Sequence, residues 1–115
     1  MKEDLKSQLS EEFAVDIIIL ANNLQNKRCN SALINQIVKS GTSIGANIAE
    51  SHYAESATDY VHKLKISLKE ASETKFWLKI LLLSNCLDQP NYENLNSKCT
   101  SLIKILSSII KSIQK

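Results

Sequence analysis

Apolar side chains recur at intervals of three and four residues along most of this chain, and this spacing constrains the fold more than any other feature. An α-helix has about 3.6 residues per turn, so side chains with this spacing line one helix face. The pattern indicates four helices, over residues 4–27, 32–54, 56–85 and 92–114. In the first of them the apolar residues are Leu5, Leu9, Phe13, Ile17, Leu20 and Leu24.

Short polar signals mark where these helices begin and end. Ser31 and Ser56 are predicted N-caps, because a serine hydroxyl accepts a hydrogen bond from the free amides of a first helical turn. Lys27 and Arg28 close the first helix, where cations complement the helix dipole. Residues 88–91, Asp-Gln-Pro-Asn, are the strongest turn signal in the chain. The connections are therefore short, and we predict an antiparallel up-and-down four-helix bundle.

The amino-acid composition agrees with an all-α fold. Two glycines and one proline among 115 residues exclude most β-rich folds, which use these residues to build their many turns. Apolar residues make up 43% of the chain and charged residues 23%, a balance typical of a globular protein. The length suits a single domain spanning residues 1–115.

The sequence shows no signal for secretion and no membrane span. Residues 1–4 carry acids where a signal peptide would be basic, and the apolar run at residues 77–83 is far shorter than a span of roughly 18 residues. Cys29, Cys86 and Cys99 form no Cys-x-x-Cys pair, and we predict three reduced thiols. These features predict a cytoplasmic protein that does not bind membranes.

Both glycines lie in one segment, GTSIGANIAES at residues 41–51, inside the second predicted helix. Gly41 and Gly45 fall in the middle of its apolar face, and Ala49 follows one turn later. Each glycine costs roughly 0.5–1 kcal/mol of helix stability relative to alanine. Close approach of another backbone would offset this cost, so these three residues are predicted to form a close helix contact.

A polar stripe borders the same face of the second helix. It consists of Ser40, Ser43, Asn47 and Glu50. Two interpretations stay open, namely a solvated flank or a partly buried hydrogen-bond network that fixes how helices or subunits dock. The stripe lacks the paired nucleophile and base of covalent catalysis. We therefore predict no catalytic residue, no enzymatic activity and no small-molecule substrate.

The third and fourth predicted helices are apolar over a wider surface than one packing face needs. Residues 76–83 are apolar almost all round, and a helix of this kind is buried on more than one side. We therefore predict a homo-oligomer. The interface candidates are Trp77, Leu81, Ile109 and Ile113.

One histidine and carboxylate pair has the spacing of a metal-binding motif. Asp59 and His62 are one helical turn apart, but di-iron bundles need two such pairs and two further carboxylates. Glu70 and Glu73 are the only other acidic pair at this spacing. His52 is interpreted as a helix-terminal cation or a loop contact. We therefore predict neither a metal nor another cofactor.

Basic residues are concentrated in the second half of the chain. Residues 57–115 carry nine Lys or Arg against five Asp or Glu, whereas residues 1–56 carry five against seven. Such lysines are able to bind the phosphates of RNA or DNA. The competing interpretation is a solvated bundle surface, since the net charge is only +2 and no aromatic platform accompanies the lysines. The candidates are Lys63, Lys65, Lys69, Lys98, Lys104 and Lys111.

Two segments resemble a known family. QIVKSGTSIGANIAES (36–51) and DYVHKLKISLKEASETKFWLKIL (59–81) closely resemble the bacterial four-helix-bundle family whose founding members are encoded by intervening sequences inside 23S rRNA genes. The Ser-Ile-x-Ala-Asn-Ile-Ala-Glu core at 43–50 and the Lys-Glu-Ala-x-Glu-Thr run at 69–74 are distinctive together. The resemblance extends over about residues 10–112.

The resemblance implies a ring of antiparallel four-helix bundles, typically a homopentamer, without enzymatic activity. The family is also similar to the accessory proteins of diversity-generating retroelements, pentamers associated with binding of nucleic acid and a reverse transcriptase through a basic surface. Many members have Gly where this chain has Ser51, and Arg where it has Lys39, which lacks the bidentate geometry of a guanidinium. We expect a non-enzymatic interaction scaffold, with RNA binding as the alternative.

Overall fold

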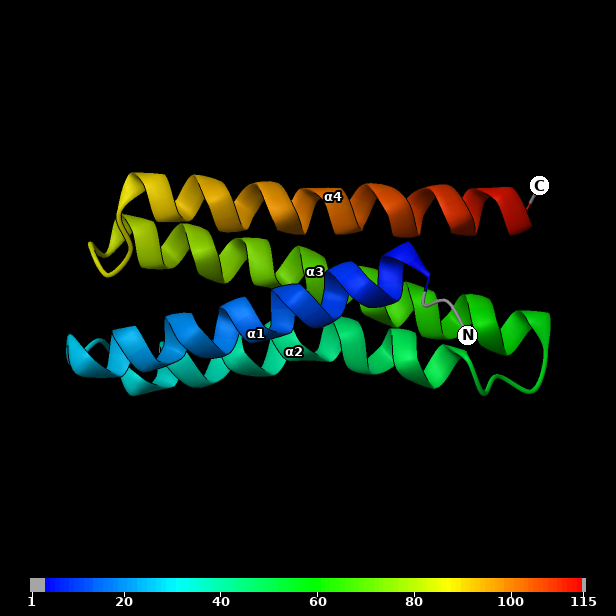
Figure 1. Cartoon of the computed structure of the whole chain (residues 1–115), viewed down its shortest axis with the longest axis horizontal. Coiled ribbons are helices and arrows are strands. Elements are labelled where there is room, and N and C mark those ends of the chain that lie inside the picture. Colours follow the sequence, from blue (N-terminus) through cyan, green and yellow to red (C-terminus); the bar gives the residue numbers. More distant parts are fainter. Residues whose placement is uncertain (1–3, 115) are drawn as a thin grey trace.

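Four α-helices make up most of residues 4–114, the part of the chain that this computed structural model describes. They are α1 (Leu5–Asn26), α2 (Ser31–Ser51), α3 (Ala57–Leu83) and α4 (Gln89–Ile113), and no strand occurs among the described residues. Successive helices run in opposite directions (Figure 1). The predicted all-α, up-and-down four-helix bundle is confirmed.

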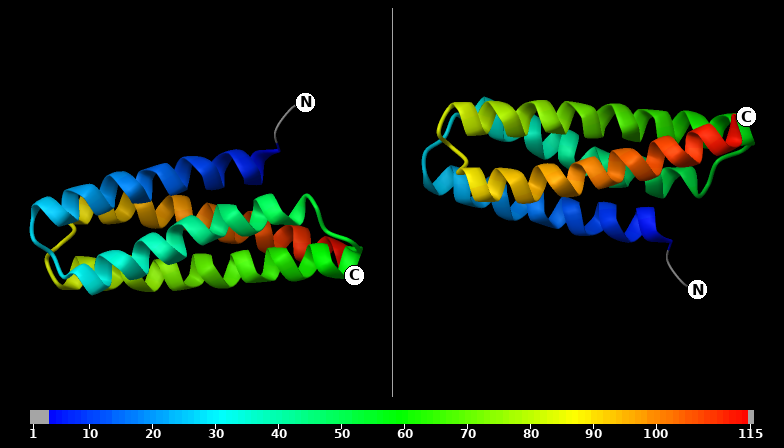
Figure 2. Two further views of the ribbon diagram at one scale, coloured as in Figure 1. Left: turned by 90° about the horizontal axis from the view of Figure 1, so that it is seen from below. Right: turned by 90° about the horizontal axis from the view of Figure 1, so that it is seen from above.

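The helices follow one another around the bundle in chain order. Each packs against the next and α4 packs against α1, so that α1 and α3 occupy opposite sides (Figure 2). The bundle measures 44 × 25 × 22 Å. α1 packs more extensively on α2 than on α4, and its N-terminal half diverges from the other helices (Figure 2). The contact between α1 and α4 is therefore the smallest of the four.

One hydrophobic core runs along the bundle axis. Leu5 does not belong to it, although it fits the predicted apolar stripe, because it lies in the diverging first turn of α1 and is 59% exposed. No helix in residues 4–114 combines the length and the apolar character that a membrane span requires. The fully buried apolar side chains include Phe13, Ile17, Leu24, Ile37, Ile44, Ile48, Leu64, Leu78, Leu81, Leu102 and Leu106.

A polar side chain caps the N-terminus of every helix. Asp4, Asn30, Ser56 and Asp88 each accept a hydrogen bond from a backbone N–H of the following turn. The predicted cap at Ser56 is confirmed. The predicted cap at Ser31 is wrong, because the preceding Asn30 side chain accepts from two backbone amides of that turn.

Two predicted helix ends differ from the structure. α4 begins at Gln89 rather than at residue 92, because Pro90 lies in the first helical turn, where its missing N–H leaves no hydrogen bond unmade. The predicted turn at residues 88–91 is thus the cap and first turn of α4. α2 ends at Ser51 rather than at residue 54, with His52 as its C-cap.

Candidate interaction surfaces

Gly41 and Gly45 lie where α2 faces α1. A Cβ atom added at Gly41 would be 2.8 Å from Ile17 Cγ1, which is too short for two carbon atoms, and one added at Gly45 would be 3.2 Å from Ser10 Oγ. The two glycines therefore let α1 pack closely on α2. The prediction that Ala49 extends this contact is wrong, because Ala49 is exposed and borders an open hollow of about 100 Å³ between the two helices.

Buried hydroxyl groups join α2 to α3. Ser67 Oγ donates a hydrogen bond to the carbonyl oxygen of Ile44 at 2.8 Å, and Thr74 Oγ1 is hydrogen bonded to Ser40 Oγ at 3.0 Å. Ser40, Ser67 and Thr74 are at most 1% exposed. The polar stripe on α2 indicates Ser40, but it does not indicate the partner on α3. The sequence contains one signal for this partner, because Ser67 and Thr74 are spaced seven residues apart in line with Leu81, which places all three on the core face of α3.

The other members of the predicted polar stripe do not form a network with Ser40. The Asn47 side chain donates to the carbonyl oxygen of Ser43 at 2.8 Å, one turn earlier in the same helix. Glu50 instead forms an exposed ion pair with Lys63 on α3, with 3.2 Å between nitrogen and oxygen. The stripe is therefore divided, with one buried hydroxyl contact at Ser40, half-buried side chains at Ser43 and Asn47, and an exposed Glu50.

The predicted subunit-interface residues have different environments. Leu81 is fully buried within the single chain, so that prediction is wrong, because the side chain points into the core from α3. Trp77 and Ile109 are half-buried against the core, and Trp77 Nε1 lies 3.4 Å from Glu73 Oε1. Only Ile113, 44% exposed near the end of α4, is a largely exposed apolar residue.

The larger exposed apolar side chains lie on α1 and α3 instead. Val15, Ile18 and Ile19 are 58%, 43% and 54% exposed, and their spacing places them together on the outer face of α1. Phe76 and Leu83 are 56% and 67% exposed, and a separation of seven residues places them along one line of α3. These two apolar patches face opposite sides of the bundle, in the half that contains the α1–α2 and α3–α4 loops.

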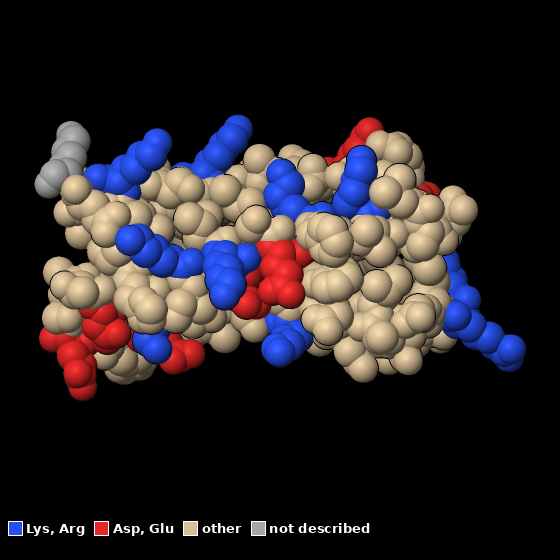
Figure 3. All heavy atoms as spheres, turned by 180° about the vertical axis from the view of Figure 1, so that it is seen from behind, with Lys and Arg blue, Asp and Glu red and all other residues tan. Residues whose placement is uncertain are grey.

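Four of the six candidate lysines are exposed and have no carboxylate partner among residues 4–114. Lys63 pairs with Glu50, and Lys98 pairs with Asp16 at 2.8 Å. Within residues 4–114, no acidic side chain lies within ion-pair distance of the other four candidates. Figure 3 shows the face formed by α2, α3 and α4, with basic side chains projecting over α3 and α4 around an acidic cluster. The four unpaired candidates are Lys65, Lys69, Lys104 and Lys111.

A polar cluster that the sequence did not suggest lies at the N-terminal end of α1. His52 Nε2 is 3.3 Å from Ser7 Oγ and 3.4 Å from Asp4 Oδ2. Burial raises the pKa of Asp4, but hydrogen bonds from Ser7 and Lys6 outweigh it and hold this pKa well below its usual range. A Ser-His-Asp triad needs one ring nitrogen for the serine and the other for the aspartate. Here Nε2 faces both groups, so the cluster is not a catalytic triad.

The residues that have the spacing of a metal-binding motif do not meet at one site. Asp59 Oδ2 accepts a hydrogen bond from the backbone of Glu55, and His62 is exposed. Burial and the neighbouring Glu73 raise the pKa of Glu70, which disfavours its charged, metal-binding form. Within the described part of the chain, no group of three His, Cys, Asp or Glu side chains is placed to hold a metal ion.

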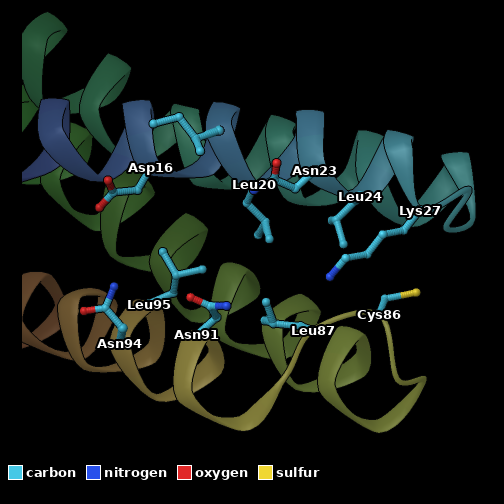
Figure 4. A pocket seen from close by; sticks show the side chains of 11 residues that line it. Asp16, Leu20, Asn23, Leu24, Lys27, Cys86, Leu87, Asn91, Asn94 and Leu95 are labelled. Atoms are coloured by element: carbon cyan, nitrogen blue, oxygen red, sulfur yellow. The ribbon is translucent and has the colours of Figure 1, made fainter.

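An open groove of about 180 Å³ lies between α1 and α4, near the α1–α2 and α3–α4 loops. Leucine side chains form its apolar floor, and polar groups project over its rim (Figure 4). The leucines are Leu20, Leu24, Leu87 and Leu95, and the polar groups are Asp16, Asn23, Lys27, Asn91 and Asn94.

Comparison with known proteins identifies the family. Residues 3–108 match the 23S rRNA-intervening sequence proteins. The chain belongs to this family. It is also similar to the crystal structure of a protein of unknown function from the S23 ribosomal protein family of Bacteroides thetaiotaomicron, with 43% identity and a TM-score of 0.91 over 93% of this chain and 99% of that one. A comparison with curated proteins found no match.

In this 23S rRNA-intervening sequence protein, the two segments that carried the resemblance, 36–51 and 59–81, meet at the α2–α3 interface. Ile44 from the core at residues 43–50 accepts the hydrogen bond of Ser67. Thr74, at the end of the run at residues 69–74, bonds to Ser40. In this chain the hydroxyl groups of Ser40, Ser67 and Thr74 therefore hold α2 against α3, which is a structural role.

Proposed function

We propose that this 23S rRNA-intervening sequence protein is a non-enzymatic scaffold that assembles into a ring of identical subunits. The observation that carries the proposal is the pair of apolar patches on opposite sides of the bundle, Val15, Ile18 and Ile19 on α1 and Phe76 and Leu83 on α3. Exposed apolar patches commonly mark protein interaction sites. When two different patches of one chain bind each other in successive copies, the contact is heterologous; it builds a ring where the rotation between copies closes and an open filament where it does not.

The native mass of the full-length protein tests this proposal. We expect a closed oligomer, and a monomer at micromolar concentration would refute it. Ile19→Glu and Phe76→Glu should each prevent assembly, because a charge would be buried in the contact. Gln25→Glu adds the same charge at another exposed position of α1 and should leave the assembly intact.

A mixture of the two disruptive variants tests the geometry of the contact. The Ile19→Glu chain keeps its α3 patch and the Phe76→Glu chain keeps its α1 patch, so one heterologous contact can form between them. We expect a one-to-one pair from the mixture and monomers from either variant alone. If Phe76→Glu alone still dimerises, the contact joins equivalent α1 surfaces and the ring proposal is wrong.

Binding of RNA is a second candidate function. It is supported by the four exposed lysines that have no carboxylate partner in the described part of the chain, Lys65, Lys69, Lys104 and Lys111. A ring would repeat this group in every subunit, and affinity for phosphates grows with the number of cations engaged. The two candidates that form ion pairs, Lys63 and Lys98, serve as the control for the four that do not.

Fluorescence anisotropy with a short single-stranded RNA tests this function. Affinity should fall steeply between about 50 and 200 mM salt, and replacing the four unpaired lysines by glutamine should weaken binding and flatten the salt dependence. Replacing Lys63 and Lys98, which already pair with carboxylates, should have a smaller effect. Absence of binding by the assembled protein at low salt would remove this candidate.

A further inference from the structure

Two helix C-termini at the same end of the bundle have the same backbone conformation and the same following residue. Arg28 after α1 has φ 60° and Asn85 after α3 has φ 63°, so both are left-handed. The next residue is a cysteine in each case. The N–H of Cys29 donates to Leu24 O at 3.0 Å, and that of Cys86 donates to Leu81 O at 2.9 Å. These bonds fold each cysteine back over the end of its helix, as in a Schellman motif.

The α1–α2 and α3–α4 loops that contain these cysteines lie side by side (Figures 1 and 2). Both side chains are half-buried against the same core. Cys86 lines the α1–α4 groove together with Lys27, two residues before Cys29, so the fold brings the two cysteines near each other. In agreement with this, the Cys86 side chain, followed by burial, raises the pKa of Cys29. Figure 4 shows the Cys86 sulfur at the loop end of the groove, at the edge of the bundle.

The third cysteine is held apart from this pair. Cys99 is fully buried in α4, and its thiol contacts the carbonyl oxygen of Ala71 at 3.2 Å. Burial raises the pKa of this thiol to about 12, so the reactive thiolate is scarce at neutral pH. Cys99 therefore serves as an internal reference for the reactivity of the other two.

We propose that Cys29 and Cys86 are a redox-responsive pair that forms a reversible disulfide between the α1–α2 and α3–α4 loops. The oxidant is a low-molecular-weight disulfide such as glutathione disulfide. The thiolate of one cysteine attacks it, forming a mixed disulfide and releasing one glutathione thiolate. The thiolate of the second cysteine then attacks the sulfur of the first cysteine in this mixed disulfide, which forms the Cys29–Cys86 bond and releases the second glutathione. The two cysteines lose two electrons and two protons, and the products are two glutathione thiols.

The bond would join the α1–α2 hairpin to the α3–α4 hairpin at the loop end of the bundle. Without this bond, the covalent connection between the two hairpins is the chain at residues 52–56, at the opposite end of the bundle. A disulfide that closes a long segment restricts the unfolded chain, and here the segment spans residues 29–86. We therefore expect the oxidised protein to melt at a temperature at least about 5 °C higher than the reduced protein.

The test equilibrates the full-length protein in glutathione buffers of increasing oxidation. Intact mass should show the loss of two hydrogen atoms, the unfolded product should retain one free thiol, and a peptide map should link Cys29 to Cys86. Cys99→Ser should still oxidise, whereas Cys29→Ser and Cys86→Ser should not. If a variant folds poorly, the peptide map of the unmodified chain still shows whether Cys29 and Cys86 are linked. Three free thiols under oxidising conditions, stable glutathione adducts or disulfides between subunits would each overturn the proposal.

Discussion

Replacing Gly41 by alanine should destabilise the bundle, although alanine is the better helix former. The added methyl group would lie 2.8 Å from Ile17 Cγ1, 3.1 Å from Cγ2 and 3.3 Å from Cδ1. Ile17 is fully buried, and its side chain is branched at Cβ, which leaves few alternative rotamers. The clash therefore has to be relieved by separating α1 from α2 or by repacking the core around Ile17.

The size of the effect follows from two opposing terms. Alanine gains about 1 kcal/mol over glycine in a helix interior. Overpacking a core by one methyl group costs about 1–3 kcal/mol, and a rigid, fully buried neighbour places Gly41 near the upper end. We expect a net loss of about 1–2 kcal/mol in the free energy of unfolding. Gly41→Leu, with a larger side chain, should disrupt the bundle.

Urea unfolding followed by circular dichroism at fixed protein concentration measures this loss. Gly45→Ala is the matched control, because its added methyl group would be 3.2 Å from Ser10 Oγ and meets no closer atom. That variant should be within about 0.5 kcal/mol of the unmodified protein or more stable than it. Ile17→Ala removes all three clashing atoms, so the double variant with Gly41→Ala should lose less than the sum of the single losses. A Gly41→Ala protein as stable as the unmodified one would contradict the close-contact argument.

Three further predictions concern single side chains. Asp4→Ala should cost about 1 kcal/mol near neutral pH through loss of the α1 cap. The pKa of Asp4 is lowered on folding, so the stabilisation by Asp4 is complete above about pH 4 and is lost as the pH falls through the folded pKa. The urea midpoint of the variant should therefore depend less on pH in the acid range than that of the unmodified protein. Thr74→Val should cost about 1 kcal/mol in urea unfolding, because it removes the buried contact with Ser40. Leu81→Ala should cost about 2–5 kcal/mol, whereas Phe76→Ala, measured on dilute monomer, should cost far less, because only Leu81 lies in the core.

The fold could be predicted from the sequence because helical periodicity is a local property. The four apolar stripes, the cap at Ser56 and the scarcity of turn residues all point to one architecture. Helix ends were less predictable where two signals competed. Asn30 and Ser31 are both good caps, and Pro90 is compatible with either a turn or the first turn of a helix.

The surfaces could be predicted only in part, because they depend on how the helices are rotated against one another. Leu81 and Phe76 both belong to the apolar run of α3, but only the packed bundle shows that one is in the core and the other exposed. The proximity of Cys29 and Cys86 depends on two loops that are far apart in the sequence and lie side by side in the bundle (Figure 2). The partner of Ser40 lies 34 positions further along the chain, so no local pattern could indicate it.

The glycines of α2 also affect how α1 is held in the bundle, and thereby which face of α1 stays exposed. Gly41 and Gly45 let α1 lie close to α2, whereas the contact between α1 and α4 is smaller and leaves an open groove. A helix held mainly from one side keeps its outer face free, and on α1 that face contains Val15, Ile18 and Ile19. The close α1–α2 contact at Gly41 therefore goes together with a free outer face of α1, and that face contains the apolar patch through which we propose that the next subunit binds.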